Sequence, residues 1–189
     1  MRSSPAQESA AGRAGGGPVS RFRRGRATAT DGHVLRSGRL DTAVGAFRPE
    51  DLREIIGAYH RCVAETTSRF AGFVAKYMGD GVLVYFGCPE AHEDDAERAV
   101  RAGLDLIDAV GRLETPEQLN IRLGVASGLV VVGDLIGAGA AQERGVVGET
   151  PNLAARLQAL AAHGTLVIGD STRRQIGALF ELNARCAER

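Results

Sequence analysis

Apolar residues recur at helical spacing in three segments of the chain, which predicts three amphipathic helices. The first begins at Pro49, which is followed by two acidic residues, and should run to about Arg69. Proline and acidic side chains are favoured there because the first turn has unsatisfied N–H groups and a positive dipole end. The other two are predicted from about Glu93 to Leu113 and from about Pro151 to Ala162, and a last short helix begins at Ser171.

Short apolar runs between these segments predict strands. Gly72–Tyr77 and Val82–Phe86 flank the sequence Met-Gly-Asp-Gly, a strong signal for a tight hairpin. Further strands are expected at 119–126, 129–135 and 166–168, with a short one at 145–147. Ser127 and Gly128 are expected to break the strand between the first two of these runs.

The predicted order from Pro49 is α-β-β-α-β-β-α-β, which indicates the α+β class and a ferredoxin-like β-α-β-β-α-β core. That core needs a strand before the first helix. Asp31–Phe47 has neither a helical nor a strand period, so we expect the first strand to be missing or replaced. Residues 1–47, which include an Ala/Gly/Ser-rich start and the basic cluster RFRRGR, are predicted to be disordered or irregular.

Composition narrows the class of protein. The chain has 189 residues, 44% of them hydrophobic, and a formal net charge of zero, which suits one globular domain and argues against a nucleic-acid partner. The three cysteines show no C-x-x-C spacing, which fits a reducing compartment. No apolar run approaches the ~20 residues of a membrane span, and no signal peptide is recognisable. We therefore expect a cytoplasmic protein that binds no membrane.

Two residues of the hairpin are candidates for chemistry. Asp80 stands between Gly79 and Gly81, where a carboxylate can project and ligate Mg²⁺ or simply complete a turn. Lys76 is the only lysine of the chain. A lysine is a compact donor, suited to the acceptor N1 of adenine and not to the donor N1 of guanine, although an exposed strand lysine is the plainer interpretation.

A third candidate is the segment GETPNLAAR. Asn152 and Arg156 are four residues apart and therefore share a helix face near its N-terminus. An amide and a guanidinium at that place could hold ribose and phosphate oxygens. A surface polar pair is the alternative.

Taken together, three blocks resemble a known family. KYMGDGVLVYFGCPEAHEDDAERAVRAGL, RLGVASGLVVVGDLIG and VVGETPNLAARLQALA resemble the class III adenylate/guanylate cyclase catalytic domain in order and spacing, from about Pro49 to Phe180. The version is similar to bacterial adenylate cyclase modules. On this basis we expect residues 48–183 to form a cyclase domain that is incomplete at both ends, with residues 184–189 as a tail.

The resemblance implies an activity. In such cyclases the ribose 3′-OH of ATP attacks the α-phosphorus, which releases pyrophosphate and gives 3′,5′-cyclic AMP for intracellular signalling. Two Mg²⁺ or Mn²⁺ ions, held by two aspartates, activate the hydroxyl and neutralise the phosphates. The sites lie in a head-to-tail homodimer, in which one protomer supplies the metal aspartates and the other contacts purine, ribose and phosphate.

It also implies roles for the candidate residues. Asp80 matches the second metal aspartate, and Lys76 the lysine that selects adenine. Asn152 matches the asparagine that orients the ribose, and Arg156 the arginine that stabilises charge in the transition state. A second purine-selecting position falls at Gly145, which has no side chain, so base selection would depend on Lys76 and on backbone groups.

Two parts of the family pattern are absent. The family's first strand carries a block of the form F-x-D-x-x-G-x-T, whose aspartate is the first metal ligand. Asp31 and Asp41 are acids in that region, but neither lies in an apolar run, and we assign the role to neither. After ALFEL the chain reads NARCAER, so the lysine that binds the triphosphate is also missing.

A change of reading frame is one explanation for the first departure. Asp31–Phe47 can be encoded with permitted GC-rich codons so that a frame one nucleotide later reads TVMFCDLVGSTRLSAR, the block that the family requires. We hypothesise that this segment is translated out of frame and that the frame is restored near Pro49. The coding DNA tests this.

The sequence thus predicts an adenylate cyclase domain with impaired turnover. Loss of one metal carboxylate removes an interaction that strengthens in the transition state, with a cost of roughly a thousandfold in rate. The alternative is a non-catalytic domain for nucleotide binding or dimerisation, derived from a cyclase. Binding of ATP without cyclic AMP formation would favour the alternative.

Overall fold

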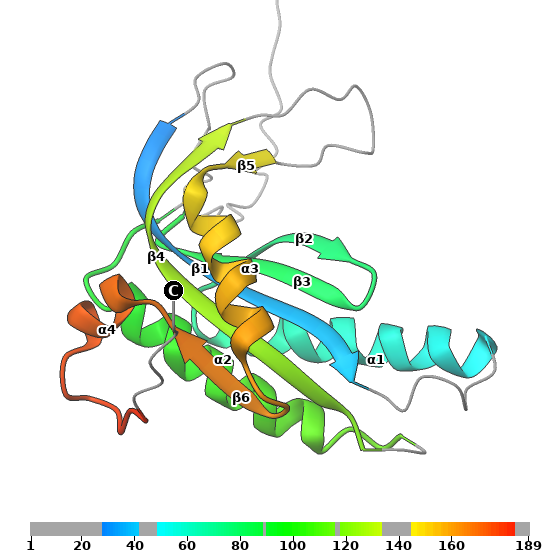
Figure 1. The fold of residues 1–189 in the computed structure, drawn as a ribbon. Helices are drawn as coiled ribbons and strands as arrows, with labels where there is room; N and C mark the ends of the chain where they lie inside the picture. The colour runs from blue at the N-terminus through cyan, green and yellow to red at the C-terminus, as the bar shows by residue number, and fades with distance from the viewer. Residues whose placement is uncertain (1–27, 42–48, 89, 116–117, 134–144, 184–189) are drawn as a thin grey trace, which may run out of the picture.

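In a computed structural model of the chain, the structure describes residues 28–41, 49–88, 90–115, 118–133 and 145–183 (Figure 1). They form six strands and four helices. The elements are β1 (Thr28–Asp41), α1 (Pro49–Arg69), β2 (Phe73–Met78), β3 (Gly81–Phe86), α2 (Asp95–Gly111), β4 (Asn120–Gly133), β5 (Gly145–Val147), α3 (Glu149–Leu160), β6 (Thr165–Ile168) and α4 (Asp170–Ile176).

The strands make one sheet in the order β2-β3-β1-β4-β5, and β6 pairs with β4. The β4–β6 pair is parallel and the other pairs are antiparallel. Helices α1 and α2 cover one face, and α3 covers part of the other (Figure 1). This arrangement confirms the predicted α+β class with its β-α-β-β-α-β core.

The first strand is replaced and not missing. Thr28–Asp41 forms β1 at the centre of the sheet, between β3 and β4, so the prediction of an irregular segment was wrong for these residues. The strand gives no alternating pattern because helices cover both faces, and Val34 and Leu35 are both buried. Residues 1–27 and 42–47, the remainder of the predicted irregular segment, lie outside the described residues.

The predicted break in the fourth strand was also wrong. β4 continues through Ser127 and Gly128, whose Cα partners on β1 are His33 and Gly32. The Ser127 hydroxyl hydrogen-bonds His33 Nδ1 and the Thr172 hydroxyl, at 2.7 Å each. Polar contacts therefore hold in the sheet a serine that the sequence pattern assigned to a turn.

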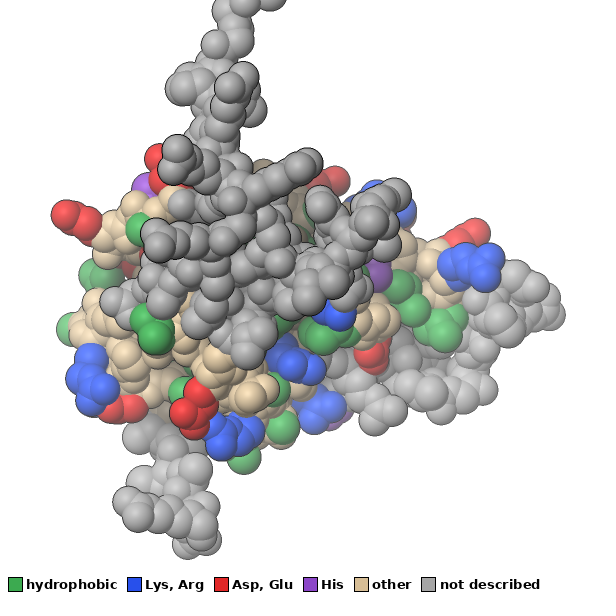
Figure 2. Space-filling view, turned by 90° about the horizontal axis from the view of Figure 1, so that it is seen from above, with side chains coloured by type: hydrophobic (Ala, Val, Ile, Leu, Met, Phe, Trp, Pro, Cys, Tyr) green, Lys and Arg blue, Asp and Glu red, His purple; other side chains and the backbone are tan. Residues whose placement is uncertain are grey.

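The remaining elements begin and end within a few residues of the predicted bounds. α1 starts at Pro49, the β2–β3 hairpin turns at Gly79 and Asp80, and β5 covers 145–147. Within the described part of the chain, no helix is both long and apolar enough to cross a membrane. Seen from above, basic and acidic side chains are interspersed over the described part of the surface (Figure 2).

Candidate functional site

The β2–β3 hairpin carries two of the predicted residues. Asp80 occupies the turn after Gly79, whose φ of 65° lies in the left-handed region that glycine adopts without strain. His60 of α1 supports this turn, because its Nε2 lies 2.9 Å from the Gly79 carbonyl oxygen and its ring stacks on Tyr77. The carboxylate of Asp80 is thus presented on a braced turn.

Lys76 lies on β2, four residues before Asp80. Its Cα partner across the strand pair is Leu83, and an irregularity between Val74 and Lys76 shifts the register there. Residues directly opposite in an antiparallel pair share a face of the sheet. Leu83 packs with the cluster under α3, so the exposed Lys76 belongs to that face and not to the face of α1 and α2.

Asn152 and Arg156 lie on α3 as predicted, with both side chains exposed. Arg156 is 3.6 Å from Glu149, an exposed ion pair that contributes little to stability. The helix is anchored at its start, because the Thr150 hydroxyl donates to the Leu129 carbonyl at 2.9 Å. The structure therefore brings Asn152 and Arg156 onto one helix, and Lys76 and Asp80 onto one hairpin, while α3 packs mainly on β4 and β1.

A buried polar network joins β1, the hairpin and α1. The Ser37 hydroxyl accepts a hydrogen bond from the Val82 N–H at 3.1 Å and also bonds the Tyr59 hydroxyl. Burial raises the pKa of Tyr59, and the nearby Asp80 carboxylate raises it further. Sequence reasoning missed this network, since Ser37 lies in the segment that showed no period.

Arg36 precedes Ser37 and lies on the opposite face, with Leu83 and Gly124 as its Cα partners. Its Nε is buried and has no hydrogen-bond partner. The Tyr85 hydroxyl is likewise buried and has no hydrogen-bond partner. Burial raises the pKa of Tyr85 to about 12, against the opposing effect of the positive charge of Arg36.

Arg36 also falls at an informative place in the sequence. In the hypothesised shifted frame, the reading TVMFCDLVGSTRLSAR would begin within the codon of Asp31, so its aspartate would begin within the codon of Arg36. Where that reading has a carboxylate, the chain has a guanidinium, a group that cannot ligate a cation.

The described residues do not fit a two-metal centre. Among them, no group of three or more histidine, cysteine, aspartate or glutamate side chains could hold a metal ion. Asp31 has Leu129 as its Cα partner and lies near the start of β1, far from the hairpin turn. Asp41 is the last residue of β1, and its side chain lies outside the described residues. Asp80 is then the one predicted metal ligand that the structure describes.

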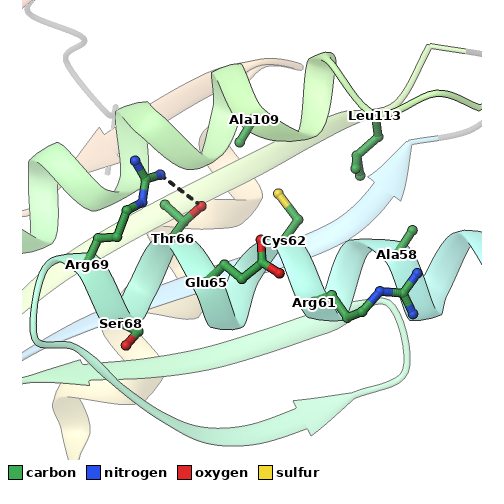
Figure 3. Close-up of a pocket in the computed structure, with 9 residues that line it drawn as sticks. All are labelled: Ala58, Arg61, Cys62, Glu65, Thr66, Ser68, Arg69, Ala109 and Leu113. Atoms are coloured by element: carbon green, nitrogen blue, oxygen red, sulfur yellow. Dashed lines mark hydrogen bonds between the residues drawn. The ribbon is translucent and has the colours of Figure 1, made fainter.

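A groove between α1 and α2 was not foreseen from the sequence. It has a volume of about 680 Å³ and is lined by Cys62, Thr66 and Arg69 of α1 and by Leu113 beyond α2, among others (Figure 3). Arg69 spans it, because its guanidinium donates to Thr66 and lies 3.7 Å from Asp105. The groove is on the face of the sheet opposite to Arg36.

Comparisons with solved structures agree with the fold. The guanylyl cyclase Cya2 superposes with a TM-score of 0.77 at 28% identity, covering 86% of this chain and 87% of that one. The catalytic core of a rhodopsin-guanylyl cyclase with converted specificity, in complex with ATPαS, gives 0.76 at 26% identity, covering 82% and 86%. The adenylyl cyclase CyaB from P. aeruginosa gives 0.69 at 25% identity, covering 80% and 82%.

Curated relatives are much longer proteins. An uncharacterized protein of Rhizobium meliloti (strain 1021) is 30% identical over 134 residues, which are 69% of this chain and 13% of that protein. One of Mycobacterium tuberculosis (strain ATCC 25618 / H37Rv) is 34% identical over 113 residues, 60% of this chain and 20% of that protein. The chain thus spans about a fifth or less of the length of these relatives.

The sequence profile described as "Adenylate and Guanylate cyclase catalytic domain" matches residues 40–187. The match covers most of the chain and includes every helix and all strands except most of β1. The chain belongs to the adenylate and guanylate cyclase catalytic domain family.

Proposed function

We propose that the chain is an adenylate cyclase-type domain that binds ATP and forms cyclic AMP at a greatly reduced rate. The observation that carries the proposal is the hairpin of a cyclase fold in which Lys76 precedes the turn residue Asp80 by four positions. The proposal extends the family assignment, which alone does not distinguish ATP from GTP.

Lys76 is the basis for preferring ATP. An ammonium group can only donate hydrogen bonds, and N1 of adenine accepts one, whereas N1 of guanine carries a proton. The backbone of β2 holds Lys76 in a strand whose register is fixed by pairing with β3. A donor on a rigid element discriminates better than one on a loop, since less of its position must be fixed on binding.

Asn152 and Arg156 would act on the ribose and phosphates. Both are exposed on α3, so neither has to be uncovered for a ligand to reach it. The amide of Asn152 can orient the ribose, and the guanidinium of Arg156 can donate to a phosphate oxygen. Arg156 would exchange its weak contact with Glu149 for this stronger one.

Turnover should be low because the described residues do not fit the metal centre on which the family depends. Attack of the ribose 3′-OH on the α-phosphorus builds negative charge, and stabilisation of that charge is commonly the largest single contribution to such a rate. Because no aspartate of the described residues is assigned the role of the first metal carboxylate, we expect a loss of roughly a thousandfold or more.

We expect a head-to-tail homodimer, as in the family that the chain resembles. One protomer would supply Lys76, Asn152 and Arg156, and its partner would supply the hairpin turn with Asp80.

Competitive titration of ATP and GTP on the purified chain tests base selection. We expect ATP to bind at least about tenfold more tightly than GTP, and Lys76→Ala to reduce that ratio to near one. A Lys76→Arg variant is the matched control for charge, since a planar guanidinium keeps the charge but changes the donor geometry. Equal affinities in the unaltered chain would contradict the proposal.

The second candidate is a non-catalytic nucleotide-binding or dimerisation domain. Arg36 favours it, because a half-buried guanidinium beside the hairpin strand is suited to hold an anion and not to activate a hydroxyl. The two candidates differ in one result: the first predicts slow formation of cyclic AMP from bound ATP, and the second predicts none.

A further inference from the structure

Arg36, Leu83 and Lys76 lie in one row across three adjacent strands. Leu83 is the Cα partner of Arg36 on one side and of Lys76 on the other. Directly opposed residues share a face, so a guanidinium and an ammonium flank one leucine on the α3 side of the sheet. Two cations on the same face create a local positive potential there.

In and beside this row are buried donors that lack an acceptor. Arg36 Nε and the Tyr85 hydroxyl have no hydrogen-bond partner, although Tyr85 is only 1% exposed. Most buried polar groups in proteins are paired, because leaving one unpaired costs free energy. Because Arg36 is always charged, protonation changes cannot relieve this cost. The missing partner is an acceptor, and for a guanidinium the strongest acceptor is an anion.

Arg36 can be reached from solvent. Its side chain is half-buried, unlike that of its neighbour Leu35. α3 contacts the sheet beside it, since a Cβ on Gly124 would lie only 2.3 Å from the Ala154 carbonyl oxygen. Arg36 therefore stands where the cover of α3 ends and the β3–β2 part of this face begins.

We propose that Arg36, assisted by the Tyr85 hydroxyl, binds a phosphate group of a nucleoside triphosphate, so that this chain binds its nucleotide without a divalent metal ion. The proposal rests on the proposed function, since it concerns the same nucleotide. In this proposal the Arg36 guanidinium lies beside the hairpin and supplies the positive charge that metal ions supply in other members of the family.

Phosphate fits these donors better than a carboxylate does. A guanidinium can donate two parallel hydrogen bonds to two phosphate oxygens, and a third oxygen remains for the tyrosine hydroxyl. A carboxylate of a second copy of the chain could accept the same two bonds, but it has only two oxygens, so the tyrosine hydroxyl would have to share an oxygen that already accepts from the guanidinium. The chemistry is common to ATP, GTP and inorganic pyrophosphate, which serves as the simplest probe.

Calorimetric titration of the full chain with ATP and with pyrophosphate, each in EDTA and in excess Mg²⁺, tests the proposal. We expect both ligands to bind in EDTA with affinities within a few-fold of those in Mg²⁺. Arg36→Gln should weaken both ligands by about tenfold or more. Tyr85→Phe should weaken both by a smaller factor.

Three further variants separate local from general effects. Arg101→Gln removes the same charge from α2, on the other face of the sheet, and should leave both affinities unchanged. Lys76→Ala should weaken ATP, whose base it reads, much more than pyrophosphate. Arg36→Lys should recover part of the affinity for both ligands, since it restores charge without the two parallel bonds.

The reciprocal variant is Arg36→Asp, which reverses the charge at this position. It should abolish binding in EDTA, because a carboxylate repels the phosphate that the guanidinium is proposed to hold. Unchanged metal-free binding in this variant would overturn the proposal.

The failure of this proposal is distinguishable from the failure of the proposed function. If ATP binds only with metal, or if Arg36→Gln leaves pyrophosphate affinity unchanged, Arg36 is not the phosphate cation, while ATP binding stands. If Arg36→Gln instead shifts only the sedimentation coefficient, the guanidinium pairs with a second copy, and the proposal is wrong. If no nucleotide binds under any condition, both proposals fail.

Discussion

The Ser37 hydroxyl holds three elements together at one atom. It accepts from the Val82 N–H of β3 and bonds the Tyr59 hydroxyl of α1, and all three groups are buried. A hydroxyl that is the partner of two buried groups contributes more than a typical hydrogen bond, because its removal leaves both unpaired.

Ser37→Ala should therefore lower the free energy of unfolding by about 2–3 kcal/mol, measured by denaturant unfolding with circular dichroism. Tyr59→Phe should cost about 1 kcal/mol, since Val82 keeps its partner. In the double variant the two losses should be less than additive. Ser68→Ala, on an exposed position of α1, is the control. Additive losses would show that the two hydroxyls do not interact.

The glycine at position 124 sets how closely α3 packs on the sheet. An added Cβ would meet the Ala154 carbonyl oxygen at 2.3 Å and the Gln158 nitrogen at 2.5 Å, both backbone atoms that cannot rotate away. The helix that carries Asn152 and Arg156 would have to move outward.

We expect Gly124→Ala to destabilise the chain by about 1–3 kcal/mol and to weaken ATP binding together with stability. Gly111→Ala, near the end of α2, meets no atom within 4 Å and should be neutral or stabilising by up to about 1 kcal/mol. Thermal unfolding of the two variants checks this. Equal melting temperatures would contradict the close packing of α3.

The elements differ in how far they could be predicted. The helices and the β2–β3 hairpin follow from local signals, namely helical apolar spacing and an Asp-Gly turn. β1 could not be predicted, because a central strand covered on both faces has no alternation, and its polar Ser37 is explained only by partners distant in sequence. Ser127 was assigned to a turn for the same reason. Serine is common in turns, but here its hydroxyl is hydrogen-bonded to His33 and Thr172, which are distant in sequence.

Those parts of the candidate site that lie within short sequence motifs could be predicted. Lys76, Asp80, Asn152 and Arg156 lie on the elements to which the motifs assigned them, and their roles stay proposals. Arg36 was not identified, because its interest depends on the pairing of β1 with β3 and on burial beside Tyr85. Neither property is encoded near it in the sequence.

At the scale of the whole molecule, the proposed site needs two copies of the chain. If each site combines residues from both protomers, ATP binding must be coupled to dimerisation by mass action. We expect the affinity for ATP to rise with protein concentration up to the dimerisation constant, and ATP to raise the dimer fraction in sedimentation velocity. An affinity independent of protein concentration, with a monomer throughout, would contradict the shared site.

We propose that this fold binds ATP and that its replaced first strand prevents efficient cyclisation. The most direct test is the rate of cyclic AMP formation by the purified chain at saturating ATP and Mn²⁺, with bound ATP quantified in the same sample. We predict bound ATP and a rate at least about a thousandfold below that of an intact adenylate cyclase domain assayed alongside. Rapid, Mn²⁺-dependent formation of cyclic AMP by the unaltered chain would contradict it.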